Sequence, residues 1–166
     1  TATADYKKLA DCDLIIEAVF EDRELKGKVT GMAENIMDSN GVFASNTSTL
    51  PITGLAERSI RPDSFIGIHF FSPVHKMKLV EIIKGEKTSA KTVAKAFDYV
   101  LKIRKIPIVV NDSRGFYTSR VFSNYTNEGL ALLAEGNHPQ AIESAGKKAG
   151  MPVGPLAVTD EVNLGL

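Results

Sequence analysis

The stretch that decides the fold spans residues 14–45. It opens with LIIEAVF at residues 14–20, a nearly continuous apolar run that is typical of a strand covered on both faces. Apolar residues then recur at helical spacing over residues 25–36, and Asp22 is placed to cap the start of that helix. A short second strand follows at residues 42–45. This strand–helix–strand order predicts a parallel sheet with helices packed on its faces.

The alternation of strands and helices continues for about two thirds of the chain and then stops. Three further strands are expected, at residues 65–71, 79–83 and 106–110. After residue 111 no strand pattern is evident, and the apolar residues fit helices, one of them capped by Asn137. We therefore predict an α/β region at residues 1–111 and the start of a mostly helical region at residues 112–166.

Composition and charge restrict the class of protein. Of the 166 residues, 43% are hydrophobic and 24% charged, which is typical of a soluble globular protein. Twenty basic residues balance twenty acidic ones, so no net field attracts nucleic acid. No apolar run reaches the roughly 20 residues that a membrane span requires. Cys12 is the only cysteine, which favours a reducing compartment, and the cytoplasm is expected.

Both ends of the sequence look like cuts. There is no starting methionine, and the last residues, NLGL at 163–166, follow closely on an expected helix start. We therefore expect a fragment of a longer protein.

His69 and Glu81 are the first candidates for chemistry. His69 ends an apolar strand, and ligands of open α/β sheets bind beyond the carboxyl ends of the strands. Histidine is the usual acid–base side chain near neutral pH, but a structural, hydrogen-bonded histidine is an equally good interpretation. Glu81 is the only charge in LVEII at residues 79–83. It either faces solvent or, if buried, needs a partner, and His69 would make a base–orienter pair with it.

Other polar residues are weaker candidates. SNTST at residues 45–49 follows a strand directly and forms either a simple turn or a lining of hydroxyl and amide donors. Glu17, Glu21 and Lys26 flank the end of the first strand, where helix-surface charges are normally solvated. The Gly-x-Gly-x-x-Gly loop that cradles phosphates is missing from the sequence.

Taken together, these segments resemble the 3-hydroxyacyl-CoA dehydrogenase family, including the dehydrogenase region of multifunctional fatty-acid oxidation proteins. The resemblance covers essentially the whole chain, and the segments occur in the order and at the spacing of the family. They are LIIEAVFE at 14–21, FASNTS at 43–48, GIHFFSP at 67–73, KLVE at 78–81, RGF at 114–116 leading to Arg120, and GMPVGP at 150–155.

The resemblance implies the C-terminal part of a Rossmann-like NAD-binding domain, followed by the start of an all-α C-terminal domain. The implied reaction is the NAD-dependent oxidation of (S)-3-hydroxyacyl-CoA to 3-oxoacyl-CoA in fatty-acid β-oxidation. The catalytic base of the family falls on His69 and its glutamate partner on Glu81. The serine near both the nicotinamide and the substrate hydroxyl falls on Ser48.

The remaining family positions fall on two charged residues and two serines. Glu21 and Lys26 match the residues on the nicotinamide side. Ser72 and Ser119 stand where many members have asparagine; we expect Ser72 to contact the cofactor and Ser119 to act on the substrate side, with a shorter donor than asparagine. The glycine-rich loop of the family lies upstream of Thr1, so a polypeptide of these residues alone is expected to bind NAD weakly.

The partners that the resemblance implies are the acyl-CoA substrate and a second copy of the chain. A homodimer through the helical region would cover apolar residues such as Phe122, Leu130 and Leu133. Membership of a multifunctional β-oxidation complex is a further expectation. Two alternatives stay open: a non-catalytic folding or dimerisation module, and a two-domain dehydrogenase that acts on a hydroxy acid without CoA.

Overall fold

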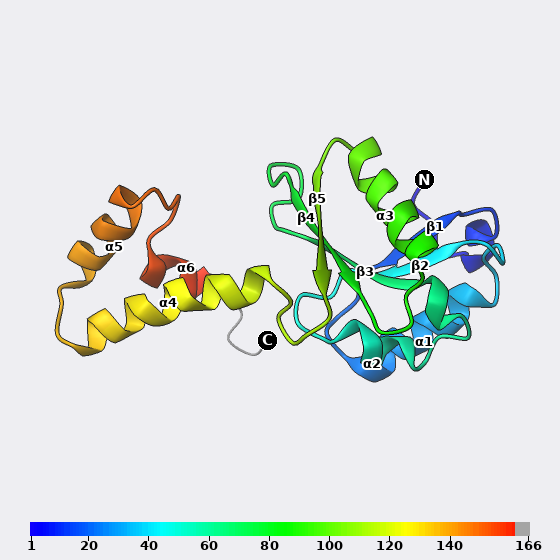
Figure 1. The fold of residues 1–166 in the computed structure, drawn as a ribbon, viewed down its shortest axis with the longest axis horizontal. Helices are drawn as coiled ribbons and strands as arrows, with labels where there is room; N and C mark the ends of the chain where they lie inside the picture. The colour runs from blue at the N-terminus through cyan, green and yellow to red at the C-terminus, as the bar shows by residue number, and fades with distance from the viewer. Residues whose placement is uncertain (162–166) are drawn as a thin grey trace. The chain divides into compact units, whose positions relative to one another are not determined.

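The structure, a computed structural model, describes residues 1–161 of the chain. It divides into two compact units, Thr1–Tyr117 and Thr118–Leu166, each with its own packing (Figure 1). The first unit is the expected α/β region and the second is helical. The division falls at Tyr117, whereas the sequence pattern placed the boundary at residue 111.

The first unit is built on a five-stranded sheet in the order β1-β2-β3-β4-β5. The strands are β1 (Leu14–Glu17), β2 (Val42–Ser45), β3 (Phe65–Phe70), β4 (Leu79–Lys84) and β5 (Ile106–Asn111). The predicted parallel pairing of β1 with β2 is confirmed, and β2–β3 and β4–β5 are also parallel. β3 and β4 run antiparallel, which the sequence analysis did not predict. Their connection, residues 71–78, is shorter than the dozen or so residues that a parallel crossover needs.

Three helices cover the sheet: α1 (Arg23–Glu34), α2 (Ile52–Ala56) and α3 (Ala90–Lys102). Two short 3₁₀ turns, η1 (Tyr6–Leu9) and η2 (Pro62–Ser64), complete the first unit. Asp22 caps α1 as predicted, because its carboxylate accepts a hydrogen bond of 2.7 Å from the backbone N–H of Leu25. Ser89 caps α3 in the same way.

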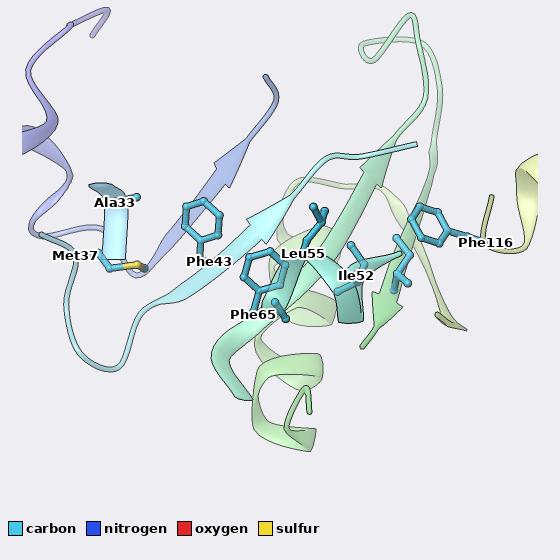
Figure 2. Close-up of a cluster of buried hydrophobic side chains, with 9 residues drawn as sticks. Ala33, Met37, Phe43, Ile52, Leu55, Phe65 and Phe116 are labelled. Atoms are coloured by element: carbon cyan, nitrogen blue, oxygen red, sulfur yellow. The ribbon is translucent and has the colours of Figure 1, made fainter. Parts of the chain in front are cut away.

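The helices pack on opposite faces of the sheet and give it two separate cores. α1 and α2 cover the face that carries Phe43 and Phe65, as Figure 2 shows. α3 covers the other face, where its Ala96 and Val100 meet residues of β2, β3 and β4. Gly67 in β3 is required on the first face, because a Cβ there would lie 2.8 Å from the Ile52 side chain. Because glycine has no Cβ, α2 can approach β3 closely.

The second unit contains α4 (Thr118–Ala134), α5 (Pro139–Lys148) and α6 (Pro155–Glu161). The prediction that Asn137 caps α5 is wrong: His138 is the capping residue, and the Asn137 amide instead donates to the Leu132 carbonyl at the end of α4. Glu143 of α5 accepts hydrogen bonds from the first backbone N–H groups of α6, the nearer at 2.8 Å. Within residues 1–161, no helix is long and apolar enough to cross a membrane.

Candidate active site

The antiparallel pairing of β3 and β4 brings His69 and Glu81 directly opposite each other. Both are buried: His69 is 5% exposed and Glu81 fully enclosed. The imidazole Nδ1 lies 2.8 Å from the carboxylate Oε2. The expected proximity of the two side chains is therefore confirmed, and the alternative of a solvent-facing glutamate is wrong. Because a carboxylate accepts, Nδ1 carries the proton and Nε2 is left as the basic nitrogen.

The second oxygen of Glu81 holds the turn that ends the first unit. Its Oε1 accepts a hydrogen bond of 3.1 Å from the backbone N–H of Tyr117. Gly115 and Phe116 just before it both have positive φ, 71° and 47°. The buried Phe116 ring lies with its centroid 6.1 Å from that of His69. Glu81 is therefore fixed at both oxygens, and a carboxylate so held presents one geometry to the imidazole.

The polar turn after β2 is hydrogen-bonded to β3 and to the segment that follows β1. The Asn46 side-chain oxygen accepts a hydrogen bond of 2.8 Å from the backbone N–H of Phe70, the residue after His69. Glu21 accepts from the Thr47 hydroxyl at 2.9 Å and from the Ser48 backbone N–H at 2.6 Å. The segment is thus a turn that also fixes Ser48 near the carboxyl ends of the strands. Among the described residues, none hydrogen-bonds the Ser48 hydroxyl.

Lys26 is buried, contrary to the expectation that these helix-surface charges are solvated. Its ammonium lies 3.0 and 3.1 Å from the two carboxylate oxygens of Glu17 and 3.2 Å from the Val19 carbonyl. Glu21 Oε2 is 3.6 Å from the same nitrogen. Glu17, at the end of β1, is buried as well. The two carboxylates and the ammonium form one cluster behind the polar turn.

Asp112 is an anchoring residue that the sequence analysis missed. Its two carboxylate oxygens accept hydrogen bonds of 2.8 Å each from the backbone N–H groups of Ile52 and Thr53, the first residues of α2. The Gly115 N–H donates to the Thr49 carbonyl nearby. The only signal in the sequence was a helix start at a proline, which has no capping side chain of its own. A helix start of this kind needs a hydrogen-bond acceptor from elsewhere in the chain, but the sequence does not indicate that Asp112 provides it.

Two models of a known enzyme family match the chain. The family model described as "3-hydroxyacyl-CoA dehydrogenase, NAD binding domain" matches residues 1–113. The model of the C-terminal domain of the same enzymes matches residues 115–166. The chain belongs to the 3-hydroxyacyl-CoA dehydrogenase family. Together the two matches cover nearly the whole chain, and they follow each other in the order that the fold predicts.

Relatives within the 3-hydroxyacyl-CoA dehydrogenase family include subunits of larger enzymes. A fatty acid oxidation complex subunit alpha from Shewanella halifaxensis is 46% identical over 164 residues, which are 99% of this chain and 23% of that protein. The chain therefore spans about a quarter of the length of the curated relatives that it matches.

Solved structures of the family superpose closely on the chain. The (S)-3-hydroxybutyryl-CoA dehydrogenase from Ralstonia eutropha is 39% identical with a TM-score of 0.91, over 96% of this chain and 57% of that one. The 3-hydroxybutyryl-CoA dehydrogenase from Escherichia coli is 34% identical with the same TM-score, over 96% of this chain and 34% of that one.

Ser72 and Ser119 are the two remaining candidates from the sequence, at positions where the 3-hydroxyacyl-CoA dehydrogenase family often has asparagine. Ser72 is exposed in the connection between β3 and β4, three residues after His69. Ser119 is half-buried in the first turn of α4, in the second unit, and its carbonyl accepts a hydrogen bond from the Ser123 hydroxyl. The roles expected for both serines remain predictions.

Proposed function

We propose that the protein carrying this chain oxidises (S)-3-hydroxyacyl-CoA to 3-oxoacyl-CoA with NAD, as a step of fatty-acid β-oxidation. The observation that carries the proposal is the buried His69–Glu81 pair, with Nδ1 engaged at 2.8 Å and Nε2 left as a base. Membership of the family supports the reaction type. The names of the relatives, a fatty acid oxidation subunit and two hydroxybutyryl-CoA dehydrogenases, support the substrate class.

His69 acts as the general base. Its Nε2 takes the proton of the 3-hydroxyl while C3 gives up its hydrogen as a hydride, so that the alcohol becomes a ketone. Glu81 stabilises the imidazolium that forms, and the fixed carboxylate needs no rearrangement as the charge appears. The Ser48 hydroxyl holds the substrate hydroxyl in line, and Ser119 acts on the substrate side.

The residues of the chain fit the nicotinamide end of the cofactor. The Glu21 side chain is 21% exposed and accepts from the Ser48 backbone N–H near the carboxyl ends of β1 and β2. Ser72 adds an exposed hydroxyl after β3. Lys26 acts through Glu21, with which it forms an ion pair. When bound, NAD accepts the hydride. The sequence contains no Gly-x-Gly-x-x-Gly loop, so the pyrophosphate is not assigned to these residues.

A single substitution tests the catalytic proposal in the natural full-length protein. His69→Gln is expected to lower kcat for acetoacetyl-CoA reduction roughly 10²–10⁴-fold, the usual effect of losing a positioned acid–base group. His75→Gln, at an exposed histidine in the β3–β4 connection, is the matched control. Near-normal turnover by His69→Gln removes His69 from the mechanism. Faster turnover of free hydroxy acids than of CoA thioesters favours the non-CoA dehydrogenase instead.

A homodimer formed by the helical unit is the partner that we propose, within a fatty-acid oxidation complex of the kind named for the relatives. Of the residues expected to be covered, Leu130 and Leu133 of α4 are exposed, whereas Phe122 is half-buried. Val121 is exposed as well, and exposed apolar residues are often covered by a partner. Light scattering on the full-length protein tests the dimer, and a monodisperse monomer contradicts it.

We also propose a cytoplasmic location, for which cell fractionation is the test.

A further inference from the structure

Glu17 is a buried carboxylate that the proposed reaction does not use. It is 5% exposed at the carboxyl end of β1. Its oxygens accept from the Lys26 ammonium at 3.0 and 3.1 Å, from the Val19 backbone N–H at 3.0 Å and from the Ser45 hydroxyl. A buried carboxylate with this many donors is held in one position, because leaving it unpaired would be very costly.

Lys26 is saturated by protein acceptors. An ammonium has three N–H groups, and those of Lys26 reach the two Glu17 oxygens at 3.0 and 3.1 Å and the Val19 carbonyl at 3.2 Å. Glu21 Oε2 lies 3.6 Å away, as an ion-pair contact. Its side chain is only 3% exposed. Lys26 therefore has little surface and no remaining donor to offer to a cofactor, and it acts on the site through its neighbours.

Glu21 is the neighbour of Lys26 that contacts the proposed cofactor site. Its carboxylate clamps the turn after β2 through the Thr47 hydroxyl and the Ser48 backbone N–H. Lys26 lies between Glu21 and Glu17, so it offsets the repulsion that two nearby carboxylates would otherwise exert. The order of contacts runs from Glu17 to Lys26, then to Glu21, and ends at the residue proposed to hold the substrate hydroxyl.

We propose that Glu17 is a positioning residue of the cofactor site, acting through Lys26 on Glu21 and on the turn at Thr47 and Ser48. The inference rests on the proposed function, since it needs the nicotinamide end to lie at this turn. The competing interpretation is a buried ion pair that only stabilises the fold. If the ion pair only stabilises the fold, the Kd for NAD and the Tm change together. If Glu17 positions the cofactor site, the Kd for NAD changes even where the Tm is restored.

The first measurement compares two buried glutamates on the natural full-length protein. Glu17→Gln removes the charge that holds Lys26, and the Kd for NAD by calorimetry is expected to rise about tenfold. Glu34→Gln is the matched control: Glu34 is also 5% exposed and also accepts from one serine hydroxyl and one backbone N–H, those of Ser59 and Ile60, but it lies at the far end of α1. Its Kd for NAD is expected to stay within about twofold of the wild type.

The second measurement separates positioning from stability. In the double variant Glu17→Gln/Lys26→Met both buried charges are gone, and replacing a buried ion pair by neutral side chains is often neutral or stabilising. The Tm is expected to recover towards that of the wild type, and the Kd for NAD to stay raised. This variant also keeps the test decisive if Glu17→Gln alone does not fold.

Three outcomes are decisive: two overturn the positioning role of Glu17, and one overturns the proposed function. A Kd for NAD that recovers together with the Tm in the double variant overturns the positioning role of Glu17. An equal rise of Kd in Glu17→Gln and Glu34→Gln does the same, since it shows a general loss of stability. A wild-type protein that binds no NAD overturns the proposed function itself, whatever the variants do.

Discussion

Replacing Glu81 by glutamine tests the catalytic pair most directly. The wild-type carboxylate is fully buried and accepts from two donors, the His69 imidazole at 2.8 Å and the Tyr117 backbone N–H at 3.1 Å. A glutamine amide has one carbonyl oxygen, so it can accept from only one of these donors and must turn its NH2 group towards the other. The substitution is nearly isosteric, and its effect therefore reports the loss of charge and of one acceptor.

The distances set the size of the effect. Two opposite unit charges 2.8 Å apart attract by about 6 kcal/mol at an effective dielectric constant of about 20, which is an upper limit before desolvation is counted. Hydrogen bonds to charged groups contribute about 1.5–3 kcal/mol net. The imidazolium that forms in the transition state loses the latter amount, so kcat for Glu81→Gln is expected to fall about 10- to 150-fold.

The assay is steady-state reduction of acetoacetyl-CoA by the natural full-length protein, with circular dichroism to measure the folded fraction. Glu86→Gln, at an exposed glutamate just after β4, is the control and is expected to leave kcat unchanged. The Kd for NAD is expected to change little in Glu81→Gln, because Glu21 and its partners are untouched. A kcat within twofold of the wild type, or a loss matched by the unfolded fraction, would refute the pair's role in the chemistry.

Three further predictions concern the packing and the cofactor. Gly67→Ala places a methyl group 2.8 Å from Ile52 and 2.9 Å from Ile83, and thermal unfolding is expected to show a loss of about 1–3 kcal/mol; an unchanged Tm would contradict the close approach of α2. Asp112→Ala removes the acceptor at the start of α2 and is expected to cost about 0.5–2 kcal/mol, measured by urea unfolding against Asp112→Asn, which keeps one acceptor. A polypeptide of residues 1–166 is expected to bind NAD only weakly by calorimetry; micromolar binding would place a pyrophosphate site within these residues.

The elements of the fold were predictable where their signal is local. A covered strand followed by a capped, periodic helix predicts β1, α1 and β2, and Asp22 caps α1 as the sequence predicts. The antiparallel turn of β3 into β4 was missed, although the short connection forbids a parallel crossover. Asn137 was misassigned because two polar residues with capping capacity stand side by side, and the second of them takes the role.

The site was harder to predict because its geometry depends on register. His69 and Glu81 were each recognisable as chemical candidates, but only the pairing of β3 with β4 puts them opposite each other. The burial of Lys26 was not predictable, since a lysine in the first turns of an amphipathic helix normally faces water. Its burial follows from Glu17, whose position at the end of β1 supplies a charge inside the protein.

The polar turn after β2 contacts both the charged cluster at the end of β1 and the strand that carries His69. On one side, the cluster of Glu17, Lys26 and Glu21 fixes the backbone of Ser48 through charge. On the other side, the Asn46 side chain binds the backbone one residue beyond His69, so the turn is also fixed to the strand that carries the base. The backbone of Ser48 and the backbone next to His69 are therefore held by separate hydrogen bonds that involve one short segment. For the proposed reaction, the turn therefore holds in advance the backbone that carries Ser48 and the backbone next to the proposed base.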